Sequence, residues 1–426
     1  MADLIQPVRG MNDVLPDEEA LWERVESAAA ALFKAYGYQR IRIPVLEKTE
    51  LFSRSIGELT DIVEKEMYTF TDRNGDSVTL RPEATAGVVR AGLSNGLLHN
   101  QAHKLWCSGP MFRREKPQKG RYRQFHQLSA EALGYADPEV DAELIAMSAR
   151  LWRELGIDGT SLELNSLGTP QSRVTYKRAL VDYFSRFKAD LDADSVRRLE
   201  RNPMRILDSK NPAMQALIAE APVLAEHLDD ESRRHFERVQ QLIADAGIEF
   251  VINPRLVRGL DYYTRTVFEW SSGRIGAQGA ICSGGRYDGL VAQLGGRDTP
   301  GVGWGLGVER VVELMRVEGV DGPTGGLDVY VVSAGEEARL ASFSAAERLR
   351  SELPGLQLRL GIVSAGVKAQ MRRAGRSGAR YALIVGDEEL AQGKFSIKAL
   401  REDQPQRLLA FDELSAMLAE AVDERR

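Results

Sequence analysis

Cysteine is scarce in this sequence of 426 residues, which has only Cys107 and Cys282 and no CxxC pair. Two isolated cysteines exclude a disulfide framework and are typical of a reducing compartment. Long apolar runs are also missing: no stretch reaches the roughly 18 residues of a membrane span, and no apolar segment follows the N-terminus. We therefore expect a soluble cytoplasmic protein with no membrane partner.

An excess of positive charge is absent as well. Lys and Arg number 56 against 62 Asp and Glu, a formal net charge of −6. Net acidity argues against indiscriminate binding to nucleic acid, so any such contact must come from local basic patches. The apolar share of 43% suits an ordinary core, and the length suits roughly two to four domains.

One local basic patch lies within residues 112–131, which read FRREKPQKGRYRQFHQLSAE. Pro117 and Gly120 sit where a turn needs a fixed φ and a permissive residue, and aromatic and polar residues alternate after them. The pattern predicts a hairpin with a basic tip that suits phosphates and a return strand that faces a small polar ligand. The alternative is a solvated hairpin with ordinary surface charge.

Apolar periodicity organises the first part of the chain. It predicts helices at 17–36, 83–96 and 139–155, and strands or hairpins at 39–46, 67–80, 104–107 and 161–165. Pro44 lies inside the first of these strands, and proline belongs at a sheet edge or where pairing stops. An edge of this kind offers a place for a partner subunit, which favours a homodimer.

The rest of the chain divides by composition. Residues 170–247 are rich in Arg, Asp, Glu, Leu and Ala with helical periodicity, which predicts a helical module inserted between two strands of one sheet. Strand patterns and glycine-rich turns resume at 249–253, 258–270 and 275–290. Residues 316–327 are rich in glycine and are typical of a linker. After them, strand and helix patterns alternate to the end, which predicts a small α/β domain with a largely parallel sheet.

Two arginines stand next to glycines. Arg310 lies in the first turn of a helix at 308–315 that follows the glycine ladder GVGWGLG at 301–307. Helix N-termini favour anions, so Arg310 is a candidate for contact with a phosphate chain, or else a capping residue. Arg258 precedes Gly259 and a Tyr262-Tyr263 pair, where a guanidinium and a phenol can share a pocket.

Together these segments resemble a known family. The Pro44 strand, FRRE at 112–115 and the ladder ending in GVER at 307–310 are similar to the three signatures of class II aminoacyl-tRNA synthetases. RPEAT at 81–85 and RGLDYYTRTVFEW at 258–270 resemble histidyl-tRNA synthetases in particular. The similarity runs from VRGMND at 8–13 to the C-terminal region. Trp304 departs from the family pattern, which suggests altered packing under the nucleotide.

The resemblance implies a fold. Residues 1–169 and 248–318 would form an α+β catalytic domain on a mainly antiparallel sheet. Residues 170–247 would be a helical insertion domain, 319–327 a linker and 328–426 an anticodon-binding α/β domain. The family also implies a homodimer.

It implies a reaction as well. L-Histidine and ATP would give histidyl-adenylate and pyrophosphate, and the histidyl group would then pass to the 3′ end of tRNA(His). Charge spreads over phosphoryl oxygens in the first step, so catalysis would be positioning and electrostatics. By resemblance Arg113 and Arg258 hold the α-phosphate and the histidine carboxylate from two sides, Arg310 holds the γ-phosphate, and Phe125 stacks on adenine. Mg²⁺ is expected on the outer phosphates, with no ligand assigned.

Specificity would require a pocket for a neutral imidazole, which has one donor and one acceptor nitrogen. Glu131 would accept from the donor, and the Tyr263 hydroxyl would complement the other nitrogen. Carboxylate, hydroxyl and amide groups would hold the α-amino group. Besides Arg113 and Arg258, the predicted histidine-binding residues are Glu83, Thr85, Gln127, Glu131, Tyr262 and Tyr263.

Two basic segments are candidates for tRNA contact. The hairpin tip would meet the acceptor end through Lys116, Lys119, Arg121 and Arg123. In the tail, a second cationic stripe would be formed by Lys368, Arg372, Arg376 and Arg380. The alternative for the stripe is a solvated helix face.

Two other functions remain open. One is a regulatory paralogue that binds histidine for a biosynthetic phosphoribosyltransferase and catalyses nothing, although such paralogues lack the anticodon domain and the signature arginines. The other is a synthetase of the same subgroup for a different amino acid, which would need no Glu131/Tyr263 pair.

Overall fold

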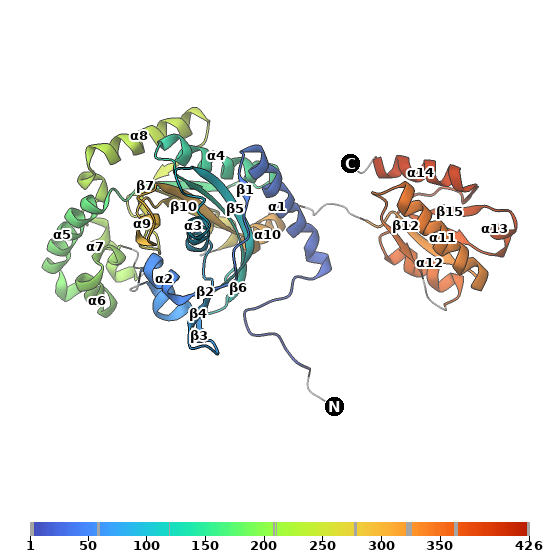
Figure 1. The fold of residues 1–426 in the computed structure, drawn as a ribbon, viewed down its shortest axis with the longest axis horizontal. Helices are drawn as coiled ribbons and strands as arrows, with labels where there is room; N and C mark the ends of the chain where they lie inside the picture. The colour runs from blue at the N-terminus through green and yellow to red at the C-terminus, as the bar shows by residue number, and fades with distance from the viewer. Residues whose placement is uncertain are drawn as a thin grey trace. The chain divides into compact units, whose positions relative to one another are not determined.

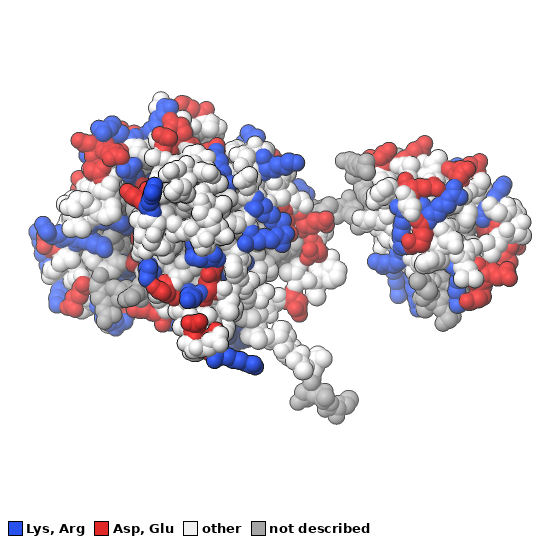
Figure 2. All heavy atoms as spheres, viewed as in Figure 1, with Lys and Arg blue, Asp and Glu red and all other residues white. Residues whose placement is uncertain are grey.

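The computed structural model describes residues 4–57, 60–118, 120–207, 209, 211–276, 279–320, 326–361 and 365–423, without the side chain of Arg201. The chain forms two compact units, Met1–Pro323 and Thr324–Arg426 (Figure 1). Figure 2 shows basic and acidic side chains intermixed over the visible face of each unit.

The larger unit is built on an eight-stranded sheet in the order β1-β5-β6-β11-β10-β9-β7-β8. Its central strands are antiparallel, and only the outer pairs β1–β5 and β7–β8 are parallel among the described strands. The predicted mainly antiparallel sheet is therefore confirmed. The strands are β1 Gln39–Arg40, β5 His103–Phe112, β6 Gln124–Leu133, β7 Ser161–Ser166, β8 Val251–Ile252, β9 Thr264–Ser271, β10 Ala280–Arg286 and β11 Gly301–Gly307.

The predicted continuous strand at 39–46 is wrong. It divides into β1 at the sheet edge and β2 (Leu46–Lys48), and residues 41–45 lie in neither. Pro44 has no N–H to donate, and the buried Arg81 guanidinium donates to the carbonyls of Ile43 (2.8 Å) and Pro44 (3.3 Å). A side chain thus takes the place of a neighbouring strand. β2 instead joins the predicted hairpin, β3 Tyr68–Thr71 and β4 Ser77–Leu80, in a small antiparallel sheet.

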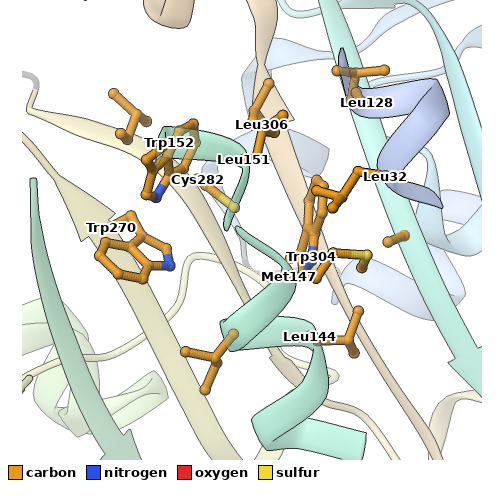
Figure 3. Close-up of a cluster of buried hydrophobic side chains, with 14 of the residues drawn as sticks. Leu32, Leu128, Leu144, Met147, Leu151, Trp152, Trp270, Cys282, Trp304 and Leu306 are labelled. Carbon is orange, nitrogen blue, oxygen red and sulfur yellow. The ribbon is translucent and has the colours of Figure 1, made fainter. Parts of the chain in front are cut away.

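The helices that cover one face of the large sheet include α1 Pro16–Ala35, α4 Pro138–Leu155 and α10 Val308–Val317. Figure 3 shows Leu144, Met147 and Leu151 of α4 among side chains from the strands. Trp304 is 1% exposed and stacks on Phe33 of α1, with ring centroids 5.6 Å apart. Because side chains alternate along a strand, Trp304 fills the core while its neighbours Gly303 and Gly305 face the other side.

The opposite face carries shorter elements and most of the inserted helices. The shorter elements are α2 Thr49–Ile56, the π-helical turn η1 Ile62–Glu66, α3 Thr85–Ser94 and α9 Leu290–Gln293. Between β7 and β8 lie α5 Pro170–Arg186, α6 Ala193–Arg201, α7 Gln215–Ala219 and α8 Asp230–Asp245, together with the 3₁₀ turn η3 Pro203–Ile206. Helices α5, α6 and α7 are on this face, whereas α8 packs against α4 and β9 in the same core as α1. The side chains of Thr169, Asp192 and Asp229 cap α5, α6 and α8. Figure 1 shows these helices gathered at one end of the unit.

The smaller unit has a five-stranded sheet in the order β13-β12-β14-β15-β16. β12, β13 and β14 are parallel, but β15 and β16 are antiparallel, so the predicted largely parallel sheet is wrong at this edge. The connections at 386–394 and 400–406 are too short for a parallel crossover. The elements are β12 Val329–Ser333, α11 Glu336–Glu352, β13 Leu358–Leu360, α12 Val367–Arg376, β14 Tyr381–Val385, α13 Asp387–Ala391, β15 Phe395–Ala399, β16 Arg407–Leu409 and α14 Phe411–Asp423.

The predicted cationic stripe is wrong at its last member. Lys368, Arg372 and Arg376 are exposed on α12, which ends at Arg376. Arg380 follows Gly378 (φ 81°), is half-buried and donates to the carbonyl of Ala421 at 2.8 Å. Across the described residues, no helix combines the length and the apolarity needed to cross a membrane.

Candidate active site

A polar cavity of about 220 Å³ opens on the sheet face opposite α1 and α4. It lies over β6, β10 and β11, between the N-terminus of α3, the loop after β5 and residues 258–263. Nine of the residues predicted to bind histidine or ATP line it: Glu83, Thr85, Arg113, Phe125, Gln127, Arg258, Tyr262, Tyr263 and Arg310. Segments far apart in sequence are thus brought to one place.

Glu131 lies beneath this cavity and is fully buried. It accepts a hydrogen bond from the Thr85 hydroxyl at 2.6 Å and another from the Tyr287 hydroxyl. Burial, with the nearby Glu83 charge, raises the pKa of Glu131 to about 8 against the lowering effect of these bonds. The carboxyl is therefore mostly neutral at pH 7 in the ligand-free protein.

The glycine ladder makes room for the polar groups of β6. A Cβ on Gly303 would come within 1.9 Å of a Glu131 carboxylate oxygen, and one on Gly305 within 2.1 Å of the Gln127 amide nitrogen. In the register of β11 and β6, Gly303 is directly opposite Glu131, and Gly305 is diagonally opposite Gln127. The Gln127 side-chain oxygen is buried without a hydrogen-bond partner, so it is available to a donor in the cavity.

Glu83 has a structural task in addition to its place at the cavity wall. Its carboxylate accepts from the backbone N–H groups of Thr85 (2.7 Å) and Ala86 (2.9 Å), the first residues of α3. These bonds satisfy helix donors that would otherwise be buried unpaired. Burial nevertheless raises the pKa of Glu83.

Arg258 is held by two residues that sequence reasoning missed. Its guanidinium donates to Glu269 at 2.5 Å and to the Ser283 hydroxyl at 2.6 Å. Glu269 and Ser283 are directly opposite each other on β9 and β10. The signal was the acid inside the otherwise apolar strand VFEW, but its partner depends on strand register. The Arg258 Nε is buried with no partner.

Tyr262 and Tyr263 line one side of the cavity, and Tyr287 packs against Tyr262. The rings of Tyr262 and Tyr263 lie 4.7 Å apart, and Tyr262 meets Tyr287 edge-on at 5.7 Å. Burial raises the pKa of Tyr263 to about 12, so its hydroxyl stays protonated and can donate or accept. Tyr287 was not predicted, because nothing in GGRYDG distinguishes it from a core tyrosine.

The other side of the cavity carries cationic groups. Arg113 donates to the Pro82 carbonyl at 2.9 Å, and its guanidinium lies 5.3 Å from the centroid of the Phe125 ring. Arg310 donates to the Gly120 carbonyl at 2.9 Å and to that of Ala280. Burial, together with the Arg121 and Arg113 charges, lowers the pKa of Arg310. Cations held this close favour an anionic ligand.

The hairpin tip is divided. Arg121 pairs with Glu115 at 3.1 Å and lines the cavity, whereas Lys116 is exposed. Arg123 donates to the Glu115 carbonyl at 3.2 Å, and its own N–H binds the carbonyl of Gly10 at 2.6 Å. Lys119 lies outside the described residues.

The donor set gives no site for a resident metal. Within the described ranges, no group of three or more His, Cys, Asp or Glu residues is placed to hold an ion. The expected Mg²⁺ thus stays a prediction tied to ATP.

Comparisons with known proteins agree with this geometry. The family described as "Histidyl-tRNA synthetase" matches residues 10–311, and "Anticodon binding domain" matches residues 328–421. The chain belongs to the histidyl-tRNA synthetase family. A histidine–tRNA ligase of Halorhodospira halophila is 56% identical over 96% of both chains, and one of Alkalilimnicola ehrlichii is 54% identical over 98% of this chain and 97% of its own.

Solved structures agree. The apo histidyl-tRNA synthetase of S. aureus has a TM-score of 0.82 and 33% identity, covering 98% of this chain and all of its own. The predicted histidyl-tRNA synthetase family and aminoacyl-tRNA ligase activity are confirmed. A Bacillus halodurans chain named as a regulatory subunit/histidyl-tRNA synthetase has a TM-score of 0.65 and 21% identity, covering 91% of this chain and 99% of its own. It shares the fold alone, so it does not favour the regulatory alternative.

Proposed function

We propose that the cavity binds L-histidine and ATP, joins them as histidyl-adenylate with release of pyrophosphate, and delivers the histidyl group to the 3′ end of tRNA(His). The observation that carries this is the convergence of Arg113, Arg258 and Arg310 on one polar cavity. They come from three segments far apart in the sequence, and a buried carboxyl lies beneath them. Guanidinium forks suit carboxylate and phosphate oxygens.

Arg113 and Arg258 are the proposed catalytic residues. The histidine carboxylate attacks the α-phosphorus, the bond to the leaving pyrophosphate breaks, and negative charge develops on phosphoryl oxygens. Arg258 is fixed by Glu269 and Ser283, and Arg113 is anchored through Pro82. Both are therefore preorganised, so they stabilise this charge without reorganising.

ATP would extend from Phe125 toward Arg310. Adenine stacking on Phe125 requires a free ring face, and Arg113 lies over one face in the ligand-free protein. Arg310 would take the γ-phosphate. Mg²⁺ that accompanies ATP would neutralise charge on the outer phosphates.

Histidine specificity is assigned to the polar floor and the tyrosine wall. Glu131 and Tyr263 would bind the two imidazole nitrogens, and the unpartnered Gln127 oxygen would accept from the α-ammonium group with Glu83 and Thr85 beside it. An amino acid whose side chain lacks both polar atoms would leave buried groups unpaired, so the site would reject it by a factor of roughly 10⁴–10⁵. No editing step is then required.

The remaining assignments concern the whole protein. The exposed Lys116, with Lys119, Arg121 and Arg123, would contact the tRNA acceptor end, and the unit beginning at Thr324 would contact the anticodon. Residues 170–247 would be an insertion into a catalytic domain of 1–169 and 248–318, with 319–327 as linker. We place the protein in the cytoplasm as a homodimer.

Pyrophosphate exchange into ATP, run separately with each amino acid, tests the proposal. Exchange should require histidine and be negligible with the other amino acids. Equal exchange with another amino acid, or none with histidine, would refute the assignment of the cavity. Light scattering after gel filtration tests the dimer.

A further inference from the structure

Residues 258–263 form one wall of the candidate active site without regular secondary structure. This segment, here called the histidine loop, carries Arg258, Tyr262 and Tyr263. On the catalytic side its backbone is held at Asp261, whose N–H donates to the Ile56 carbonyl at 3.1 Å. The position of this wall therefore also depends on contacts to the face of the loop that points away from the active site.

The inserted helices supply those contacts. Arg173 of α5 donates to the carbonyl of Tyr263 at 2.8 Å, and Arg205 of η3 donates to that of Gly259 at 2.9 Å. The two bonds grip the loop near its beginning and its end. Charged donors to backbone carbonyls are among the stronger hydrogen bonds in proteins.

Both arginines make further contacts. Arg173 also donates to the carbonyl of Asp261 at 3.5 Å, and the backbone carbonyl of Arg205 accepts from Arg198 of α6 at 3.0 Å. The strand after the loop is tied to the insertion too: Arg265, with φ of 45°, pairs with Glu231 of α8 at 2.7 Å.

A second cavity, of about 330 Å³, lies behind the loop and is lined by Arg173, Arg205, Leu260, Asp261 and Tyr263 among others. The histidine loop thus separates two cavities, and side-chain packing supports it less than it supports a core segment. Point contacts from the arginines then have a large share in fixing its position.

We propose that Arg173 and Arg205 are positioning residues, through which the helical insertion holds the histidine loop in the conformation that binds the amino acid. The inference rests on the proposed function, because it takes the loop as the histidine-binding wall. A displacement of the insertion is transmitted to Arg258 and Tyr263 through these two bonds. The insertion and the amino-acid site are in this way coupled.

The test uses the full chain with Arg173→Met, Arg205→Met and the corresponding lysine variants. Arg178→Met is the matched control, since Arg178 is an exposed arginine on the same helix as Arg173. Histidine-dependent pyrophosphate exchange gives KM for histidine, KM for ATP and kcat, and thermal unfolding gives Tm.

Each methionine variant should raise KM for histidine by about tenfold, because a charged hydrogen bond to the loop is lost. KM for ATP should stay within about twofold and lysine should restore part of the loss, since it keeps a donor. Arg178→Met should behave as wild type. Unchanged KM for histidine in both methionine variants overturns the proposal, and so does a parallel rise for histidine and ATP with a lowered Tm.

Hydrogen exchange separates this inference from the proposed function. Backbone amides of residues 259–264 should exchange faster in both methionine variants than in Arg178→Met. This expectation does not depend on which amino acid the wild-type protein activates. If wild type shows no histidine-dependent exchange of pyrophosphate, the proposed function fails, and the amide rates still decide the positioning role. Equal rates in all variants would refute it.

Discussion

Arginines in the interior of the larger unit differ in how many guanidinium donors remain available to a ligand. Arg81 is 4% exposed, and its guanidinium donates hydrogen bonds to the carbonyls of Ile43, Pro44 and Pro110. Arg286 is fully buried and is paired with Asp141 and Asp288. Arg258 by contrast borders the cavity and keeps an unpartnered Nε. Arg258 is therefore the one of these three that is placed to contact a ligand.

Arg258→Ala should therefore impair the chemical step more than the fold. Removal of one preorganised charge donor typically costs about 10²–10³ in rate, and Glu269, which keeps 26% side-chain exposure, can be solvated when its partner is lost. Single-turnover formation of histidyl-adenylate measures the rate, and calorimetry measures Tm. Arg255→Ala, which changes an exposed arginine three residues earlier in the chain, is the control. Unchanged adenylate formation would remove Arg258 from the catalytic set.

Glu131 predicts a pH dependence. Its folded pKa of about 8 lies above the ordinary value of 4.5 for a glutamate, so between these values the folded state binds more protons than the unfolded state. The Glu131 contribution to stability is then present below pH 4.5 and is lost as pH rises toward 8, by up to about 1.4 kcal/mol per pH unit. Glu131→Gln should flatten this slope relative to wild type in denaturant unfolding at pH 5–8. An identical slope in both proteins would show that Glu131 ionises normally.

At the scale of elements, the two faces of the glycine-rich strand β11 have different roles. Gly303 and Gly305 make room for the polar groups of β6, and the even positions, including Trp304, fill the core. The alternation of glycine with larger residues is visible in the sequence, but the reason for the glycines is not. That reason depends on which side chain of the neighbouring strand would meet an added Cβ. The predicted change of packing under the nucleotide is wrong, because the Trp304 side chain lies on the helix-covered face of the sheet, against Phe33 of α1.

A series of alanine substitutions along β11 tests this division. Gly305→Ala should displace the flexible Gln127 amide, 2.1 Å from the new Cβ, and raise KM for histidine with little change in Tm. Gly303→Ala should also lower Tm, because its Cβ would meet the backbone carbonyl of Ala130 at 2.5 Å. A loss of roughly 1–3 kcal/mol is expected for such overpacking.

Gly307→Ala is the control in this series. Its Cβ would lie 3.9 Å from the nearest neighbouring atom, a side-chain carbon of Arg310, which is ordinary contact. Kinetics and thermal unfolding on the three variants give the comparison. If Gly305→Ala bound histidine as well as Gly307→Ala does, the role of the ladder in shaping the pocket would be wrong.

How far sequence reasoning reached depended on the range of the interaction. Helices α1 and α4 and the hairpin β5–β6 were predictable, since their periodicity and turn residues are local signals. The division of the 39–46 strand was not, because Arg81, far along the chain, competes for its carbonyls. Glu269, Ser283 and Tyr287 were missed at the site for the same reason: each matters through a partner set by register.

For the whole molecule, the two units have separate apolar cores. The larger one includes Trp304 and Met147, and the smaller one includes Val331, Leu383 and Leu418. The family description that matches residues 10–311 ends before the second unit begins. Each unit therefore has the core that independent folding requires.

A chain truncated after Val320 tests this separation. It should fold with a cooperative transition and keep histidine-dependent pyrophosphate exchange within about threefold of the full chain, because every cavity residue lies before Val320. Charging of tRNA should fall by at least about tenfold, since the anticodon contacts proposed for the second unit are removed and each 1.4 kcal/mol of lost binding is a tenfold effect. Aminoacylation at limiting tRNA measures the loss, and exchange without tRNA is the internal control. Full charging activity in the truncated chain would show that the second unit contributes nothing to tRNA selection.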